Sequence, residues 1–147
     1  MKRLYLLRHG QTEFNVKKRV QGRCDSPLTV LGHQQARAAA AWLKAHGVVP
    51  DKVVSSPLGR AMDTASLVAT ELLGPDAAVE PCEGIIERCY GTFEEGPHDA
   101  LPTDVWDPGE DLIPFGGEGS HALQERMVAT LTNLMSAKDT ETLLAVS

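Results

Sequence analysis

Leu4-Tyr5-Leu6-Leu7, followed at once by Arg8-His9-Gly10, is the most informative stretch near the amino terminus of this sequence. Four consecutive apolar residues without polar alternation are typical of a strand that is covered on both faces within a parallel sheet. The run then stops at a cation, an imidazole and a glycine. We therefore predict a buried strand over 4–7 whose carboxyl end presents polar side chains.

The residues that follow show a repeating strand-and-helix pattern. Thr29 is the expected N-cap of an alanine-rich helix over 30–46, and Gly47 is its expected end. A second strand is predicted over 52–55 and a second helix over 58–73. Because strands that alternate with helices are typical of parallel sheets, the pattern predicts a domain of the α/β class.

The rest of the sequence combines a long irregular segment with one more helix and one more strand. Residues 81–119 are rich in Gly, Pro and acids, and only 84–90 suggest local order. We interpret this segment as a lid or substrate loop. Ser120 is the expected cap of the next helix, and 142–146 is the last predicted strand. The core-facing stripe of that helix is predicted to contain Leu123, Met127, Leu131, Leu134 and Met135.

Length and composition indicate a single domain over residues 1–147. With 147 residues, 42% apolar and 23% charged, the chain has the make-up of a soluble globular protein. No apolar run approaches the roughly 18 residues of a membrane span, so no membrane partner is expected. The apolar run between Arg3 and Arg8 is too short for the core of a secretory signal, which predicts a cytoplasmic location.

The cysteines and histidines show no metal-binding pattern. Cys24, Cys82 and Cys89 are odd in number, and their spacing matches neither a paired motif nor a zinc site. We expect reduced thiols that serve mainly in packing. Neither a metal nor a cofactor is predicted.

The net charge of −6 is unevenly distributed along the sequence. Basic residues gather in 1–23, whereas 80–118 are strongly acidic and contain Arg88 as their single basic residue. A nucleic acid partner would require a broad basic face with interleaved aromatic residues, so a small anion is the better prediction. The acidic stretch itself is interpreted as a solvated loop.

The two strand exits predict where chemistry takes place. In parallel sheets the carboxyl ends of the strands share one edge, and this edge would bring Arg8 and His9 close to Arg60. Guanidinium groups match the oxygens of a phosphoryl group, and an imidazole beside such a group can be a nucleophile, a proton carrier or a donor. The residues alone leave these three roles of His9 open. No function is predicted for the remaining histidines, His33, His46, His98 and His121.

Taken together and in order, the motifs of this sequence resemble the histidine phosphatase superfamily, specifically its phosphoglycerate mutase-like branch. The first motif is Leu6-Leu7-Arg8-His9-Gly10-Gln11-Thr12-Glu13-Phe14-Asn15. Later segments that fit the same family are 21–29, 55–65, 85–96 and 117–120. The resemblance implies a three-layer fold with a mostly parallel sheet flanked by helices.

The resemblance also implies a role for each matching residue. His9 would attack phosphorus and become a transient phosphohistidine, while Arg8 and Arg60 would hold the phosphoryl oxygens. Asn15 would add a polar contact. Glu87 would donate the proton to the leaving oxygen, and its acidic neighbours would help to keep its carboxyl protonated towards neutral pH.

One feature of the family has no counterpart in this sequence. Family members have a second active-site histidine, usually in a His-Gly pair directly after a strand that resembles 142–147, and the sequence ends at that point. The family fold is therefore expected to be cut short at its carboxyl terminus. A truncated product and an omitted tail both account for this. A complete chain would have reduced activity and an exposed sheet edge.

Three functions follow from this comparison. The first is a metal-independent phosphatase of small phosphate esters that acts through a phosphohistidine. The second is a phosphoglycerate mutase-type transfer, in which the phosphoryl group returns to a second hydroxyl of the substrate. The third is a degenerate module that binds a phosphorylated ligand without turnover. In each case the partner is a small phosphorylated metabolite, and the oligomeric state stays open.

Overall fold

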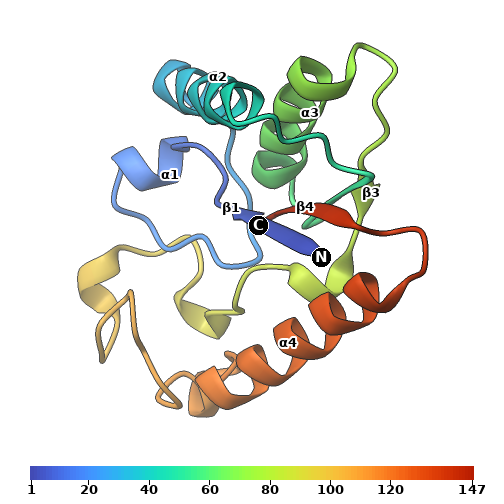
Figure 1. Ribbon diagram of the computed structural model, residues 1–147. Helices are drawn as coiled ribbons and strands as arrows, with labels where there is room; N and C mark the ends of the chain where they lie inside the picture. Colours follow the sequence, from blue (N-terminus) through green and yellow to red (C-terminus); the bar gives the residue numbers. More distant parts are fainter.

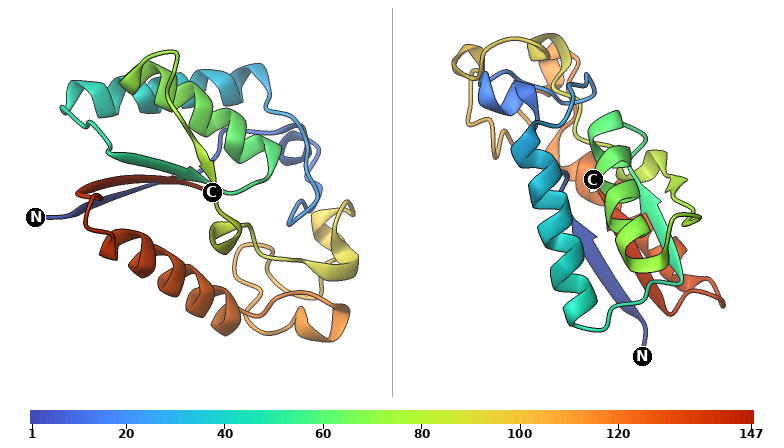
Figure 2. Two further views of the ribbon diagram at one scale, coloured as in Figure 1. Left: turned by 90° about the vertical axis from the view of Figure 1, so that its right-hand side faces the viewer. Right: turned by 90° about the horizontal axis from the view of Figure 1, so that it is seen from above.

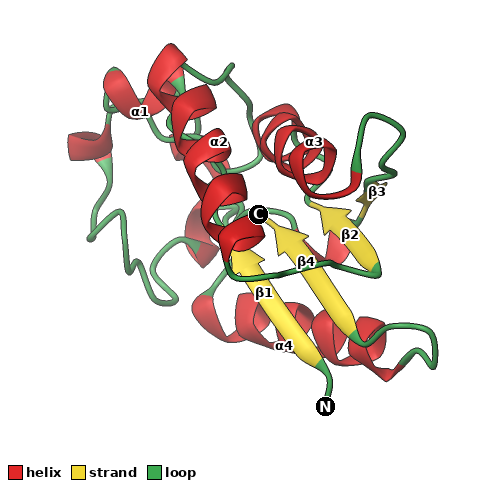
Figure 3. Cartoon of the chain, turned by 45° about the horizontal axis from the view of Figure 1, so that its top comes forward, coloured by secondary structure: helices red, strands yellow, loops and turns green.

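A four-stranded sheet, in which neighbouring strands all pair in parallel, forms the centre of the computed structural model, which describes residues 1–147. Figure 3 shows these strands side by side with their carboxyl ends at one edge. The order across the sheet is β1 (Arg3–Leu7), β4 (Thr142–Val146), β2 (Lys52–Ser55) and the short β3 (Glu80–Pro81). The prediction of a parallel α/β sheet is confirmed.

Helices cover both faces of the sheet and give the molecule three layers (Figures 1 and 2). α2 (Val30–Ala45) and α3 (Gly59–Leu73) lie together on one face, and α4 (Ser120–Ser136) lies on the other. The short α1 (Glu13–Val16) stands apart from these layers near the strand exits. None of the helices has both the length and the apolar sequence needed to cross a bilayer.

Local capping explains the bounds of these helices. The Thr29 hydroxyl accepts a hydrogen bond from Gly32 N at 3.0 Å and begins α2, as predicted. The chain leaves α2 just before Gly47, whose φ of +66° is a conformation that glycine adopts readily. The predicted cap of α4 is wrong by one residue: Gly119 is the N-cap, and the Ser120 hydroxyl instead donates to Gly109 O at 3.1 Å.

The two apolar strands β1 and β4 differ in how deeply they are buried. β4 lies between β1 and β2, and its residues 143–146 are all buried. β1 forms the edge of the sheet, and its Leu4 and Leu6 side chains are 38% and 63% exposed. The prediction that 4–7 are covered on both faces is therefore wrong. An edge strand lacks the second neighbour that would complete its cover.

The α4 face has a core of its own. Its fully buried residues are Val54, Ile85, Leu143 and Ala145. Four members of the predicted stripe, Met127, Leu131, Leu134 and Met135, pack against this cluster. The fifth, Leu123, lines the cavity described below, so the stripe is confirmed except at its amino-terminal end.

The segment 81–119 is more ordered than its composition suggests. It contains the single-turn 3-10 helices Glu83–Ile85, Gly91–Phe93, His98–Ala100 and Ile113–Phe115. Leu101 and Leu112 pack with Val20 in a small core beneath it. Its acids are not merely solvated, since Glu118 forms an ion pair with Arg126 at 2.6 Å.

Candidate active site

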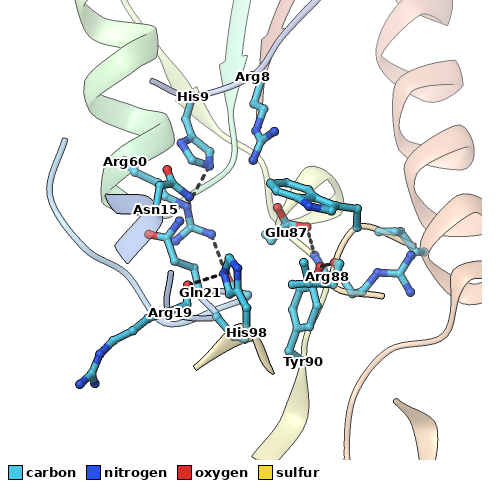
Figure 4. A pocket seen from close by; sticks show the side chains of 15 residues that line it. Arg8, His9, Asn15, Arg19, Gln21, Arg60, Glu87, Arg88, Tyr90 and His98 are labelled. Carbon is cyan, nitrogen blue, oxygen red and sulfur yellow. Dashed lines mark hydrogen bonds between the residues drawn. The ribbon is translucent and has the colours of Figure 1, made fainter. Parts of the chain in front are cut away.

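A cavity of about 270 Å³ opens at the carboxyl edge of the sheet. Its wall contains all five residues that the sequence singled out: Arg8, His9, Asn15, Arg60 and Glu87. Figure 4 shows His9, Asn15 and Arg60 on one side of the cavity and Glu87 on the other, with Arg8 between the two groups. The predicted convergence of the strand exits is therefore confirmed, while the chemical roles of these residues stay predictions.

His9 is held in one tautomer. The ring is buried, and Nδ1 lies 2.7 Å from Gly10 O, which can only accept a hydrogen bond. Nδ1 therefore carries the hydrogen and Nε2 carries the lone pair. Nε2 in turn accepts a hydrogen bond from Arg60 Nε at 3.3 Å.

The surroundings of His9 favour the neutral ring. Burial lowers the pKa of His9 below its ordinary value of 6.5, and the positive charges of Arg60 and Arg8 lower this pKa further. The contact with Gly10 O and the negative charge of Glu87 act in the opposite direction but do not outweigh burial. A neutral imidazole is the form in which histidine acts as a nucleophile, and an attack by Nε2 would replace its hydrogen bond with Arg60 Nε.

Gly10 packs the backbone after His9 closely against α2 and α3. Its N–H donates to Thr64 Oγ1 at 3.1 Å, and a Cβ at this position would collide with the carbonyl of Gly32 in the first turn of α2. The missing side chain therefore makes room for the backbone of α2.

Arg60 is a buried guanidinium whose donors are mostly engaged within the chain. Nη1 donates to Cys24 O at 2.7 Å and to Asp25 Oδ1 at 3.1 Å, and Nη2 donates to Gly22 O at 2.6 Å. With the bond to His9, four of its five N–H groups are used. One Nη2 hydrogen remains for an anion. Arg60 is therefore a positive charge in a fixed position, and it cannot bind an anion through two free N–H groups.

Arg8 is held in a different way. The side chain is exposed, and its guanidinium makes neither a hydrogen bond nor an ion pair within the chain. Its Cζ lies 5.4 Å from the ring centroid of Trp106, which is within cation–π range. All of its N–H donors are therefore available to a ligand.

Asn15 contributes one end of its amide to the cavity. Its Oδ1 accepts a hydrogen bond from Thr12 N at 2.9 Å, and Asn15 N donates to Thr12 Oγ1 at 3.3 Å, which together form the capping box of α1. The amide nitrogen has no such partner. The donor end of Asn15 is thus the end that remains for a ligand.

Glu87 occupies the wall opposite His9. Its Oε1 accepts from Arg88 N at 2.7 Å, and its backbone carbonyl accepts from Arg126 Nη2 at 3.3 Å. The acidic neighbour Glu94 is engaged elsewhere, because Glu94 Oε1 accepts from the backbone N–H of Arg23 at 2.5 Å. The carboxyl group of Glu87 is thus oriented by the adjacent backbone N–H of Arg88.

The wall also contains residues for which the sequence predicted no role in the site. The additional lining residues are Arg19, Val20, Gln21, Gly22, Arg88, Tyr90, His98, Val105, Trp106 and Leu123. His98, to which no function was assigned, is among them. His98, Val105 and Trp106 come from the segment 81–119, which was interpreted from its sequence as a lid or substrate loop.

The strand exit of β4 lies beside this cavity. His9 N donates to Ser147 O at 2.9 Å, and Ser147 lines a neighbouring hollow together with Arg8 and Glu87. The resemblance places the family's second histidine directly after this strand. The residue before that position, Ser147, is hydrogen-bonded to the backbone of His9.

A parallel α/β fold that gathers a neutral imidazole, two guanidiniums and a carboxylate at the strand exits defines an enzyme-like site for a small anion. The model of the histidine phosphatase superfamily (branch 1) matches residues 4–147. The chain belongs to this superfamily, which is a family of enzymes.

Curated relatives in this family include mutases and phosphatases. The chain is 34% identical to a probable phosphoglycerate mutase GpmB of Proteus mirabilis over 154 residues, which covers 100% of this chain and 69% of the relative. It is 39% identical to a broad-specificity phosphatase of Saccharomyces cerevisiae over 92 residues, which covers 63% of this chain and 40% of that protein.

Solved structures show the same fold. The structure of a mycobacterial glucosyl-3-phosphoglycerate phosphatase in complex with VO3 superimposes with a TM-score of 0.84 at 30% identity. The match covers 100% of this chain and 76% of that protein. The chain thus spans 69% of the length of the Proteus mirabilis relative and 76% of the length of the mycobacterial phosphatase.

Proposed function

We propose that this chain is a metal-independent phosphatase of small phosphate esters that acts through a phosphohistidine on His9. The observation that carries the proposal is the tautomer of His9, because its contact with Gly10 O leaves Nε2 as an unprotonated nitrogen beside Arg60. A lone pair next to a fixed positive charge is arranged to attack an anionic phosphoryl group that the same charge attracts.

In the first step, Nε2 of His9 attacks phosphorus and the bond between phosphorus and the ester oxygen breaks. Arg8 and Arg60 offset the negative charge on the phosphoryl oxygens, and Asn15 donates an additional hydrogen bond. The carboxyl of Glu87 gives its proton to the departing oxygen, so the product leaves as an alcohol. The position of Glu87 across the cavity from His9 supports this role.

In the second step, water attacks the phosphohistidine. The Glu87 carboxylate takes a proton from the water, a bond between phosphorus and the water oxygen forms, and the bond to Nε2 breaks. Inorganic phosphate leaves and both His9 and Glu87 return to their starting protonation states. The two arginines supply the positive charge that other phosphatases obtain from metal ions, so activity is expected to persist in EDTA.

Mutase activity is the second candidate, and the name of the Proteus mirabilis relative favours it. It would use the same phosphohistidine but return the phosphoryl group to a second hydroxyl of the bound substrate. Such an enzyme must exclude water from the intermediate. The Saccharomyces cerevisiae phosphatase and the mycobacterial phosphatase support hydrolysis.

The test compares phosphate release from a panel of small phosphate esters with the interconversion of 2- and 3-phosphoglycerate. His9→Asn is the matched variant, because the Asn amide can still donate to Gly10 O but lacks the attacking nitrogen. We expect phosphate release by the natural chain, none by His9→Asn, and no effect of EDTA. Interconversion with negligible release would establish the mutase instead, and phosphate binding without either reaction would establish a binding module.

A further inference from the structure

The two arginines of the cavity differ in what holds them. Arg60 is 2% exposed and bonded through four N–H groups, so its guanidinium is in place before any ligand arrives. Arg8 is exposed, and its guanidinium is held by a cation–π contact with the indole of Trp106. A free arginine side chain loses rotamer entropy when it grips a ligand, and a contact that already fixes it reduces this loss.

Trp106 is exposed over 70% of its surface, yet its location is fixed by the segment that carries it. At the start of this segment, His98 N donates to Lys18 O at 3.0 Å, and His98 Nε2 donates to Arg19 O at 3.1 Å. The His98 ring also meets the indole edge to face at a centroid distance of 6.5 Å. The segment is therefore tied to the loop after α1.

The other end of the segment is tied to residues 88–90, directly after Glu87. The Tyr90 hydroxyl donates to Val105 O at 2.9 Å, directly before Trp106. Arg88 Nη1 donates to Gly109 O at 3.2 Å. Trp106 thus lies between two anchored points, and both anchors belong to walls of the same cavity.

We propose that Trp106 is a positioning residue that holds the Arg8 guanidinium over the phosphoryl site through a cation–π contact. This proposal rests on the proposed function, in which Arg8 grips the phosphoryl group. The anchored segment 97–109 sets the place of the indole, and the indole sets the place of the cation. The negative ring face attracts the guanidinium plane while its N–H groups stay free for oxygen atoms.

The size of the effect follows from the strength of an exposed cation–π contact. Loss of the ring face is expected to weaken anion binding by about two- to five-fold. Because Arg8 grips the phosphoryl group both in the substrate complex and in the transition state, KM should rise by about this factor while kcat changes less. A ring that replaces the indole should restore most of the affinity.

The experiment compares Trp106→Leu with Trp106→Phe by calorimetric titration with inorganic phosphate and orthovanadate, and by kcat and KM for one ester. Trp42→Leu is the matched control, since Trp42 is also exposed, at 56%, but stacks on His46 at the far end of α2. We expect weaker binding for Trp106→Leu, near-normal binding for Trp106→Phe and normal binding for Trp42→Leu. Equal losses for the Leu and Phe variants would overturn the proposal.

A double-mutant cycle with Arg8→Gln tests whether Trp106 acts through Arg8. In the Arg8→Gln background, Trp106→Leu should have no further effect on phosphate affinity, and an undiminished effect would show that Trp106 acts by another route. Urea unfolding of each variant is the folding control, and no change is expected because the indole is exposed. Failure of the proposed function would look different from these outcomes. The unsubstituted protein would then bind phosphate with an affinity that depends on Trp106, but it would release no phosphate from esters.

Discussion

Arg60 Nε donates a hydrogen bond to His9 Nε2 at 3.3 Å, so the buried cation points directly at the lone pair of the imidazole. The same guanidinium is held by the carbonyls of Gly22 and Cys24 and by the carboxylate of Asp25. Arg60 therefore has two functions in the structure. It holds the loop before α2 in place, and its charge adds to the effect of burial in lowering the pKa of His9.

Replacing Arg60 should affect stability far more than replacing Arg8. Arg60→Ala leaves the buried carbonyl of Gly22 and the partly buried carbonyl of Cys24 without donors, and it should lower the free energy of unfolding by about 2–4 kcal/mol. Arg8→Ala removes an exposed side chain without hydrogen bonds and should change it by less than about 0.5 kcal/mol. Urea unfolding at neutral pH measures both. Similar losses for the two variants would show that the Arg60 contacts do not hold the fold.

The lowered pKa of His9 predicts a pH dependence of stability. Between that lowered pKa and 6.5, the unfolded chain binds more protons at this residue than the folded chain does. The free energy of unfolding should therefore fall as pH falls from 6.5 towards the folded-state pKa, and His9 should have no influence on its slope above 6.5.

His9→Asn removes this contribution, and unfolding of both proteins between pH 5 and 8 isolates it as a difference. NMR titration of the ring gives the pKa of His9 directly. We also expect the acid limb of kcat/KM to lie below 6.5, because the nucleophile must be neutral. A His9 pKa above 6.5 would contradict the account of its environment.

Glu87→Gln should have an effect that depends on the leaving group. An alkyl ester needs a proton on its departing oxygen, so its kcat should fall by about 10²–10⁴. A nitrophenyl ester leaves as a stable anion, and its phosphorylation step should change little. Glu83→Gln, in the same acidic stretch but outside the cavity wall, is the control. Equal losses for the two esters would exclude Glu87 as the proton donor.

The ion pair of Glu118 with Arg126 should contribute measurably to stability. Arg126 donates to both carboxylate oxygens, at 2.6 and 2.8 Å, and this bonding lowers the pKa of Glu118. Glu118→Gln should lower the free energy of unfolding by about 1–3 kcal/mol at neutral pH. Because a lowered carboxyl pKa stabilises the fold only while the group is ionised, this difference should shrink as pH falls through that pKa.

The exposed pair of Glu13 with Lys17 provides the comparison for this ion pair. Its side chains are half exposed, so Glu13→Gln should change stability by less than about 0.5 kcal/mol. Both variants can be followed by urea unfolding at several pH values. A loss for Glu118→Gln as small as that for Glu13→Gln would show that the buried geometry adds nothing.

Sequence patterns were sufficient where the signal is local. The predicted helix over 30–46 differs from α2 by one residue at its end, because Thr29 and Gly47 mark its boundaries by their own chemistry. The burial of a strand, by contrast, could not be predicted from its own residues. The runs 4–7 and 143–146 are equally apolar, but only the second is central, and strand order decides which one is covered.

The same distinction applies to the site. Arg8 and His9 could be predicted because they follow β1 directly, and Arg60 because it lies at the start of α3, shortly after β2. Parallel strands bring these exits together. His98 and Trp106 could not, because long-range bonds place them, such as the one from Tyr90 to Val105 O. Nothing in the residues around Trp106 indicates that Tyr90 would donate a hydrogen bond to Val105 O.

The central claim is that His9 bonds to phosphorus. Rapid acid-free quenching of the natural chain during ester turnover, followed by mass spectrometry of its peptides, tests it directly. We predict an acid-labile phosphoryl group on the peptide that contains His9, formed faster than phosphate is released and missing from His9→Asn. Phosphate release without any phosphorylated His9 at early times, or release that persists in His9→Asn, would contradict the account.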